Sequence, residues 1–471
     1  MRRTKIVATL GPASSDPGSI DAIIKAGADV LRLNLAHAEA RRQPALAKTV
    51  RDLAGANGKV VSILADLPGP KLRTGPVADG EVRLEAGETF DLREGSAPGD
   101  VEGVTTTVPE IANLLEAKDE IFLADGQIVL DVEEVRSGNV RTRVVRGGIL
   151  RSGKGMHIPS AERKLEAFTR RDDEALAQAL AIGADLIGLS FVRRADDVAS
   201  VKNKIGSSLP NPPAIVAKIE TRSAVENIDE IIEIADAVMV ARGDLGIQLP
   251  FRQVPMLQKD IIGACNRAGT PVITATQMLE SMTRSPLPTR AEVNDVANAV
   301  IDGTDAVMLS EETAIGDYPA ETVRVMGAIA LEVELRSVAR IGATAGSDDP
   351  VSWAIARAAV QASEELRVAA ILCPTRTGAT ARRIAAFRPS MPILALDHSI
   401  ETLRSLALVW GVVPFEVPFL RAEELSVRGL KRALDAARES GLAHPGERVT
   451  LVAGGSPPRT ASTDLVRILT L

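Results

Sequence analysis

The stretch DDEALAQALAIGADLIGLSF, residues 172–191, joins a helical pattern directly to a strand pattern. Its first half spaces apolar residues as on one face of an amphipathic helix. Gly183 then suits the left-handed residue that ends a helix. The apolar run at 186–189 does not alternate with polar residues, which is typical of a strand covered on both faces. The stretch therefore predicts a helix followed by a buried parallel strand.

Similar units recur along the chain. A glycine again stands between helix and strand patterns at Gly27, Gly269 and Gly303. Eight short apolar runs, each ending in a polar residue, follow one another: TKIVATLG (4–11), DVLRLN (29–34), VSILAD (61–66), DLIGLSF (185–191), AIVAKIE (214–220), AVMVARGD (237–244), PVITATQ (271–277) and AVMLSEE (306–312). Eight such units predict an α/β chain folded as a (β/α)8 TIM barrel, whose active site lies at the carboxyl ends of the strands.

Two regions do not follow this repeating helix and strand pattern. Residues 76–158 show alternating segments that predict a small antiparallel β-domain with one short helix near 110–117, inserted where a lid would lie. After a linker at 340–350, helix and strand patterns alternate as in an open α/β domain, including a helix over 400–410. The expected domains are the barrel in two parts (1–75 and 159–340), the inserted lid (76–158) and the C-terminal domain (341–471).

Composition narrows the functional class. The chain has 471 residues and a net charge of −7, which argues against a general nucleic-acid or anionic-membrane surface. No run of about 18 apolar residues predicts a membrane span, and the start of the chain does not resemble a signal peptide. Cys265 and Cys373 lie far apart in separate apolar patterns. We therefore expect a reduced, cytoplasmic setting.

Polar residues close nearly all of the eight strands. The set comprises Arg32, Asn34, Asp66, Lys71, Arg73, Ser190, Lys218, Glu220, Arg242, Asp244, Thr276, Ser310, Glu311 and Glu312. Taken singly, a charged residue at a strand end is usually solvated, and a lone Glu–Lys pair is a salt bridge of little value. Their recurrence at successive strand ends indicates one shared site.

Two of these residues supply candidate metal ligands. Lys218 and Glu220 are two apart on a strand and so project from one face. Glu220 and Asp244 are carboxylates with no neighbouring histidine or cysteine, which favours magnesium. Zinc is not expected, because the histidines are scattered at His37, His157, His398 and His444.

The basic residues of the set favour a phosphorylated ligand. They are Arg32, Lys71, Arg73 and Lys218. The chain has no GxxxxGK[ST] loop, so it does not bind a nucleotide through a P-loop. Together with the carboxylates, they predict magnesium-assisted chemistry on a small phosphorylated anion.

Nine motifs, in the family's order, resemble the pyruvate kinase family. They are TKIVATLGPAS (4–14), LRLN (31–34), GPKLRTG (69–75), KIE (218–220), VARGDLG (240–246), ATQMLESM (275–282), PTRAE (288–292), DVANAV (295–300) and GDYPAETV (316–323). The resemblance implies a barrel with a small β-barrel lid and a C-terminal α/β domain. It also implies transfer of a phosphoryl group from phosphoenolpyruvate to ADP, giving pyruvate and ATP, the last step of glycolysis. The family is usually tetrameric, so a homotetramer is expected.

The resemblance implies roles for the charged residues at the centre of the site. Glu220 and Asp244 would bind Mg2+, or Mn2+ in its place, and the ion would hold phosphoenolpyruvate. Lys218 would touch the transferring phosphoryl group and stabilise the charge that builds there and on the enolate. Arg32 would grip the same phosphate. Such roles fit a reaction that proceeds mainly by positioning and charge neutralisation.

The resemblance also implies roles for the uncharged groups and for the nucleotide site. Gly243, through its backbone amide, and Thr276 would hold the substrate carboxylate. Thr276, with Ser310 nearby, would belong to the route that protonates the enolate. The nucleotide-binding residues would be Arg73, Lys154 and Asn34.

The sequence departs from the family pattern around a potassium site. In the common form, an asparagine, a serine, an aspartate and a threonine hold K+, but here Ala36 replaces the serine and Leu67 the threonine. Lys71 replaces a glutamate, and lysine at this position is associated in the resembled family with activity that needs no monovalent cation. We therefore expect that K+ is not required and that Lys71 supplies the charge. His157, where asparagine is usual, and Glu311, where glycine is usual, have no interpretation from the sequence.

The C-terminal domain carries a second candidate phosphate site. CPTRTGATARRI, residues 373–384, places threonines, arginine and glycine at a strand-to-helix turn, where backbone amides can bind phosphate. Residues 453–464 could close over it, and a phosphorylated effector would fit. The alternative is a capped helix beside a surface loop.

Two other functions stay open at this stage. A barrel lyase or aldolase acting on an enolate would also bind magnesium and a pyruvate-like acid, but it has no need for a lid. A non-catalytic regulatory relative would be expected to lose Lys218, Glu220 or Asp244, and all three are present.

Overall fold

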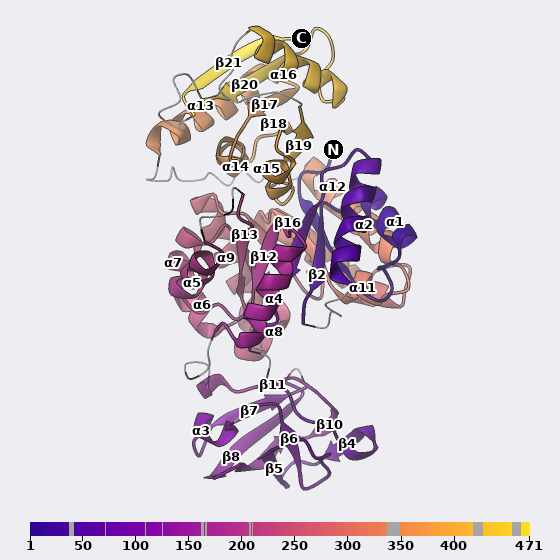
Figure 1. Ribbon diagram of the computed structural model, residues 1–471, viewed down its shortest axis with the longest axis vertical. Coiled ribbons are helices and arrows are strands. Elements are labelled where there is room, and N and C mark those ends of the chain that lie inside the picture. Colours follow the sequence, from indigo (N-terminus) through magenta and orange to yellow (C-terminus); the bar gives the residue numbers. More distant parts are fainter. Residues whose placement is uncertain are drawn as a thin grey trace.

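Eight parallel strands close into a barrel at the centre of the molecule (Figure 1). Their order around the barrel is β1-β16-β15-β14-β13-β12-β3-β2. The strands are β1 (Lys5–Leu10), β2 (Val30–Asn34), β3 (Ser62–Asp66), β12 (Leu186–Leu189), β13 (Ala214–Ile219), β14 (Ala237–Ala241), β15 (Val272–Ala275) and β16 (Ala306–Leu309). Each falls within one of the eight apolar runs, so the barrel predicted from the sequence is confirmed.

The computed structural model describes most of the 471-residue chain. The described residues are 1–36, 42–70, 72–108, 110–124, 126–161, 164, 167–206, 209, 211–336, 349–417, 427–454 and 463–471. Lys71 and His37 lie outside them, as does nearly all of the predicted linker at 340–350.

Helices cover the outside of the barrel (Figure 1). They are α1 (Pro17–Ala26), α2 (Gln43–Ala56), α4 (Arg170–Ala181), α5 (Ala195–Ile205), α6 (Arg222–Glu226), α7 (Ile228–Ile234), α8 (Arg242–Gln248), α9 (Val254–Ala268), α10 (Arg290–Asp302), α11 (Glu311–Ala314) and α12 (Pro319–Arg336). Gly183 follows α4 with φ +63° and Gly303 follows α10 with φ +95°. A side chain would be strained at either angle, which explains a glycine between helix and strand.

The strands bury apolar side chains on both faces. One face packs against the helices in a core that includes Ile63, Ile187 and Ile219. The other face fills the barrel interior with residues such as Leu64 and Val216. Burial on both faces accounts for apolar runs that do not alternate.

Between β3 and α4 the chain forms a separate β-domain that we call the lid. Its elements are β4 (Glu81–Leu84), β5 (Thr89–Glu94), β6 (Gly103–Thr106), α3 (Ile111–Leu114), β7 (Glu120–Leu123), β8 (Ile128–Arg136), β9 (Asn139–Arg146), β10 (Gly148–Arg151) and β11 (Met156–His157). They make a β10-β4 pair and a six-stranded sheet, β11-β7-β8-β9-β5-β6, around a core centred on Phe90. The predicted all-antiparallel arrangement is wrong at one point, because β5 and β6 are parallel. The eight-residue connection between them lets the chain return to run in the same direction.

The C-terminal domain is a five-stranded α/β sheet in the order β19-β18-β17-β20-β21. Its elements are α13 (Pro350–Leu366), β17 (Ala370–Pro374), α14 (Ala379–Ala386), β18 (Ile393–Asp397), α15 (Ile400–Ser405), β19 (Val412–Glu416), α16 (Val427–Glu439), β20 (Arg448–Ala453) and β21 (Leu465–Thr470). Two of these, β19 and α16, were not predicted. β19 lies at the edge of the sheet, where Pro414 is tolerated although it lacks an N–H.

The helix predicted over 400–410 ends early, at Ser405. The following residues form turns, and Leu408 is buried together with the apolar side chains of the barrel interior. The apolar spacing of residues 406–410 favours a continuing helix. The residues are apolar because they pack against the barrel.

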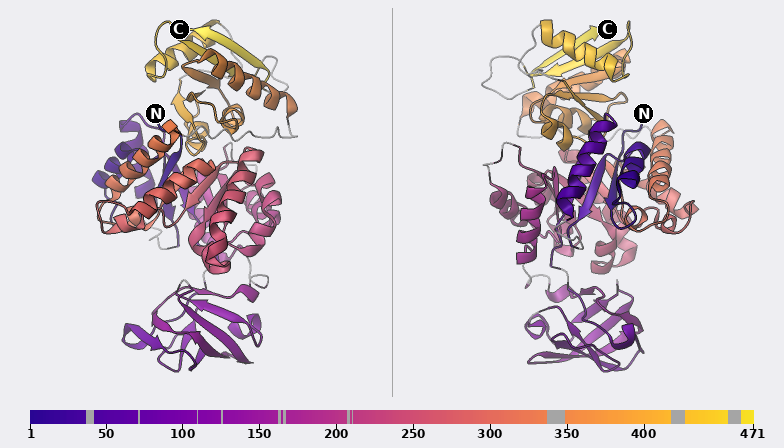
Figure 2. Two further views of the ribbon diagram at one scale, coloured as in Figure 1. Left: turned by 180° about the vertical axis from the view of Figure 1, so that it is seen from behind. Right: turned by 45° about the vertical axis from the view of Figure 1, so that its right-hand side comes forward.

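The lid and the C-terminal domain lie at opposite ends of the barrel (Figures 1 and 2). The C-terminal domain is fixed to the end where the strands begin. There Arg388 binds Asp305 with 2.8 Å and 3.0 Å hydrogen bonds, and Nζ of Lys5 donates to the carbonyl of Val412. The lid is connected at the other end, after β3, where the strand-end residues lie. In the part of the chain that the structure describes, no helix is long and apolar enough to cross a membrane.

Candidate active site

Lys218 lies at the centre of a buried charged cluster. It comes from the end of β13, and only 8% of its surface is exposed. Its Nζ lies 2.9 Å from Glu220 Oε1 and 3.2 Å from Asp66 Oδ1, and it donates to Ser190 Oγ over 2.8 Å. Burial by itself would lower the pKa of Lys218, but the two carboxylates outweigh burial and raise the pKa above its ordinary value. Lys218 is therefore held as a cation.

Asp66 links Lys218 to Arg32. Arg32 lies on β2, and its Nε donates to Asp66 Oδ2 over 2.9 Å. The register of β2 and β3 accounts for this contact, because it brings their carboxyl ends together, with Asn34 opposite Asp66. Burial would raise the pKa of Asp66, but Lys218 and Arg32 lower it, so Asp66 stays ionised. The structure thus brings together Arg32 and Lys218, two of the cations expected to hold phosphate.

Glu220 carries the features expected of a metal ligand. Its Oε2 accepts a 2.8 Å hydrogen bond from the backbone N–H of Phe191. Burial, with the nearby charge of Asp244, raises the pKa of Glu220 above its ordinary value, against the opposing effect of Lys218. Two carboxylates that repel one another in this way form a set of hard oxygen donors that a divalent cation would stabilise. The residues therefore fit Mg2+, with water and substrate oxygens completing its coordination. The protein would contribute only these two carboxylates, because the described residues contain no group of three or more His, Cys, Asp or Glu that could hold a metal.

Gly243 and Thr276 are in direct contact, as expected for groups with a shared role. The Gly243 amide donates to Thr276 Oγ1 over 2.8 Å. Thr276 has φ +68°, a left-handed conformation that is rare for a β-branched residue and is characteristic of functional sites. Arg242 fixes the local backbone, since it pairs with Asp295 at 2.8 Å and donates to the carbonyl of Ala275.

Ser310 lies at the end of β16, just before α11. Its backbone N–H donates to Glu312 over 2.7 Å. Its Oγ is buried and has no hydrogen-bond partner among the described residues. A free hydroxyl in this position can still donate or accept a proton.

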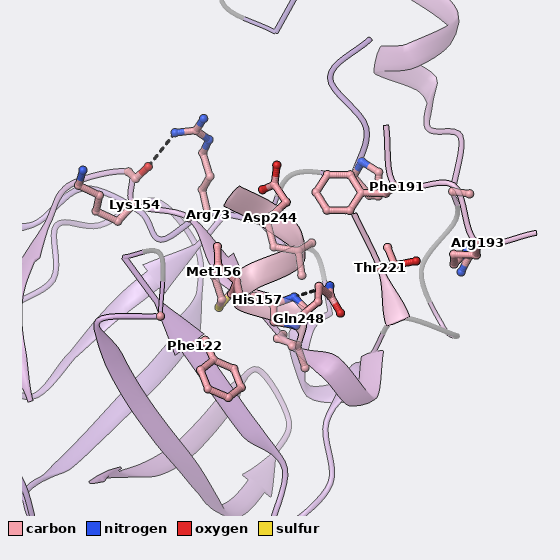
Figure 3. A pocket seen from close by; sticks show the side chains of 18 of the residues that line it. Arg73, Phe122, Lys154, Met156, His157, Phe191, Arg193, Thr221, Asp244 and Gln248 are labelled. Carbon is pink, nitrogen blue, oxygen red and sulfur yellow. Dashed lines mark hydrogen bonds between the residues drawn. The ribbon is translucent and has the colours of Figure 1, made fainter. Parts of the chain in front are cut away.

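A cavity of about 560 Å3 lies between the lid and the barrel (Figure 3). Lys154 lines it from the lid and Arg73 from the segment that leads into the lid, whereas Asp244 and Glu311 line it from the barrel side. Arg73 donates to the carbonyl of Gly153 over 3.0 Å. The structure therefore brings the two expected phosphate-binding cations of the nucleotide site to the cavity that Asp244 also faces.

Asn34 is not placed with those cations. It is absent from the described lining of the cavity, and its side-chain oxygen accepts a hydrogen bond from the N–H of Ala36. Lys71 lies outside the described residues, although its neighbours Pro70 and Leu72 both line the cavity.

The sequence did not single out several groups that the site uses. The Phe191 amide binds Glu220, and Gln248 lines the cavity and binds His157. Asp66 stands out in the sequence as a strand-end acid near Lys71 and Arg73, but its bridge between Arg32 and Lys218 is not visible there. A backbone amide leaves no signature in the sequence, and Gln248 carries no charge to mark it.

Comparison with known proteins shows to which family this fold belongs. The model of the pyruvate kinase barrel domain matches residues 1–323, and that of the pyruvate kinase alpha/beta domain matches residues 353–469. The chain belongs to the pyruvate kinase family. Pyruvate kinases are phosphotransferases, so the comparison decides against a lyase or aldolase.

Individual pyruvate kinases are similar to this chain over nearly its whole length. The pyruvate kinase of Methylorubrum extorquens is 43% identical over 99% of this chain and 97% of its own length. The pyruvate kinase of Thermococcus litoralis is 42% identical over 99% of this chain and 98% of its own length. That of Geobacillus stearothermophilus is 40% identical over 99% of this chain and 80% of its own length.

Proposed function

We propose that this chain transfers the phosphoryl group of phosphoenolpyruvate to ADP, giving pyruvate and ATP, at the carboxyl end of its barrel. The observation that carries this proposal is Lys218, a buried cation held between Glu220 and Asp66. Phosphoryl transfer is catalysed mainly by positioning and by neutralising charge. A fixed ammonium in a buried site is suited to that task, because it needs no reorganisation as charge develops.

Metal and phosphate would be bound by the same cluster. Glu220 and Asp244 would hold Mg2+, or Mn2+ in its place, and the bound ion would supply a second positive charge to the phosphoryl group. Arg32 would hold the phosphate from β2, where its guanidinium is oriented by Asp66. Lys218 would contact the phosphoryl group and the enolate oxygen.

The remaining roles concern the carboxylate, the proton and the nucleotide. The Gly243 amide and the Thr276 hydroxyl would bind the substrate carboxylate; they lie side by side, with 2.8 Å between the amide nitrogen and Thr276 Oγ1. Thr276 and the unpartnered hydroxyl of Ser310 would serve the route that protonates the enolate. The nucleotide phosphates would bind Arg73 and Lys154; a contribution from Asn34 rests on the resemblance alone.

We further propose that the chain belongs to the lysine-type subgroup and needs no K+. Leu67 supports this, because its side chain is 1% exposed and packs in the apolar core of the barrel, where a cation-binding oxygen would otherwise be. Ala36 likewise has no side-chain oxygen. Lys71 would supply the missing charge.

The C-terminal domain would bind a phosphorylated effector beside the turn before α14. Support comes from Arg376, Arg382 and Arg404, which line a cavity of about 1130 Å3 there. The amide of Gly378 in this turn already donates to Thr375 Oγ1 over 2.9 Å. We also propose that the chain forms a homotetramer and lies in the cytoplasm. Its domain limits would be at 75/76, 158/159 and 340/341.

The activity is tested by mixing the purified chain with phosphoenolpyruvate, ADP and Mg2+ and measuring ATP with luciferase. We expect ATP and pyruvate to form in equal amounts. Pyruvate without ATP would contradict phosphoryl transfer to the nucleotide.

Loss of either metal carboxylate should change the magnesium requirement. Asp244→Asn or Glu220→Gln removes a charged oxygen donor, so we expect the Mg2+ concentration for half-maximal activity to rise about tenfold or more. Activity is titrated against Mg2+ at saturating substrates. Glu226→Gln, at an exposed carboxylate of α6, serves as the control and should match the unmodified chain. Unchanged curves in both site variants would place the ion elsewhere.

A further inference from the structure

A hydrogen bond joins the lid to the barrel at the wall of the cavity (Figure 3). Gln248 and His157 are the partners, with 2.9 Å between Gln248 Nε2 and His157 Nδ1. His157 belongs to β11 of the lid. Gln248 is the last residue of α8, the helix that also carries Asp244. The bond therefore connects a lid strand to the helix that bears a proposed metal ligand.

The imidazole of His157 acts in this contact as a neutral acceptor. With Gln248 Nε2 as the donor, Nδ1 accepts and the ring proton is on Nε2, which is buried without a partner among the described residues. Burial lowers the pKa of His157 to about 4, which keeps the ring neutral near pH 7. The ring also stacks on Phe122 of β7, with centroids 6.0 Å apart, so its orientation is fixed within the lid.

The same part of the lid carries Lys154 and is paired with Arg73, the two proposed nucleotide contacts. Lys154 is three residues before His157, and Arg73 pairs with Gly155 across an isolated β-bridge. The N–H of Met156 donates to the carbonyl of Leu72 over 2.9 Å. A displacement of His157 away from α8 would therefore move both cations away from Asp244.

We propose that the His157–Gln248 hydrogen bond is a latch that holds the lid closed and so positions Lys154 and Arg73 for the nucleotide phosphates. Both latch partners are positioning residues, since they act through other groups. The proposal rests on the nucleotide contacts proposed above. It also gives His157 a function. The asparagine that is usual at this position in the family has an amide oxygen, which would accept the same hydrogen bond as Nδ1 of His157.

The latch has a specific kinetic consequence. If ADP binds only when the lid is closed, its apparent affinity equals its affinity for the closed form multiplied by the fraction of molecules that are closed. Breaking the latch lowers that fraction, so KM for ADP should rise. Saturating ADP draws the lid closed again, so kcat should change little. KM for phosphoenolpyruvate should also change little, because Arg32 and Lys218 belong to the barrel.

The experiment compares steady-state kinetics of latch variants. His157→Ala and Gln248→Ala should each raise KM for ADP roughly three- to tenfold, the value of one net hydrogen bond, with kcat within about twofold. The double variant should be no worse than either single one, because each change removes the same interaction. His157→Asn should restore KM, since the asparagine oxygen can accept from Gln248. Arg143→Ala removes a contact with Glu133 that stays within the lid, and it should leave KM unchanged.

The outcomes separate the latch from the proposed nucleotide site. If Lys154→Met raises KM for ADP while His157→Ala and Gln248→Ala do not, the latch is wrong and the nucleotide site stands. If Lys154→Met leaves KM unchanged, the proposed nucleotide contact is overturned, and the latch with it. Additive effects in the double variant would also overturn the latch. Circular dichroism would show whether His157→Ala unfolds the lid. If it does, the test of the latch rests on Gln248→Ala, because that change leaves every lid residue in place.

Discussion

Replacing Lys218 by methionine is expected to lower kcat at least a hundredfold. Methionine keeps most of the length of the side chain but removes the buried cation that lies between Asp66 and Glu220. Losing one preorganised charged group that stabilises a transition state costs on the order of a hundred- to a thousandfold in rate. The measurement is ATP formation at saturating phosphoenolpyruvate, ADP and Mg2+.

Binding should survive this change. Glu220 and Asp244 remain as metal ligands, and Arg32 remains paired with Asp66, so calorimetry should still detect Mg2+ and phosphoenolpyruvate. Lys48→Met is the matched control, because Lys48 is an exposed residue paired with Asp52 on α2, and it should keep full activity. A folded Lys218→Met chain with near-normal kcat would remove Lys218 from the mechanism.

Replacing Lys71 by glutamate is expected to abolish most of the activity in buffer free of Na+ and K+, with a loss on the order of a hundredfold. The unmodified chain should be fully active in the same buffer, because the tethered ammonium stands in for the monovalent cation. In Lys71→Glu that charge is reversed. Added K+ should restore activity only partly, since neither Ala36 nor Leu67 offers a side-chain oxygen.

Rebuilding the cation cage gives the sharper test. In the triple variant Ala36→Ser, Leu67→Thr, Lys71→Glu, K+ should restore far more activity than in Lys71→Glu alone. Lys25→Glu, at an exposed lysine of α1 paired with Asp21, is the control for the charge reversal and should stay independent of K+. An unmodified chain that is silent until K+ is added would overturn the tethered-charge proposal.

The barrel could be predicted from the sequence because its signals are local. Each strand is an apolar run of a few residues, and a glycine such as Gly183, at φ +63°, marks where a helix gives way to a strand. Repetition of this unit eight times indicates closure without any knowledge of a distant contact. Glu220 could be placed with Lys218 for the same reason, since the two lie two apart in sequence and their side chains meet at 2.9 Å.

Other features depended on contacts that no local pattern encodes. The pattern of residues 406–410 favours a continuing helix, but the chain turns there and buries Leu408 with the barrel interior. The edge strand Val412–Glu416 was missed because Pro414 interrupts its pattern, although at a sheet edge a missing N–H costs little. In both places, packing outweighed local preference.

The sequence alone thus determined the (β/α)8 barrel, the inserted lid and the acids and bases at the strand ends, because periodicity and turn residues act over a few positions. Only the tertiary structure decided how those side chains pair. Asp66 reaches Lys218 across 152 positions, and His157 reaches Gln248 across 91. Such pairs form because barrel closure brings strand ends together and because the lid returns to the same rim. The charge state of Lys218 and the neutral imidazole of His157 follow from that burial and pairing, which exist only in the folded chain.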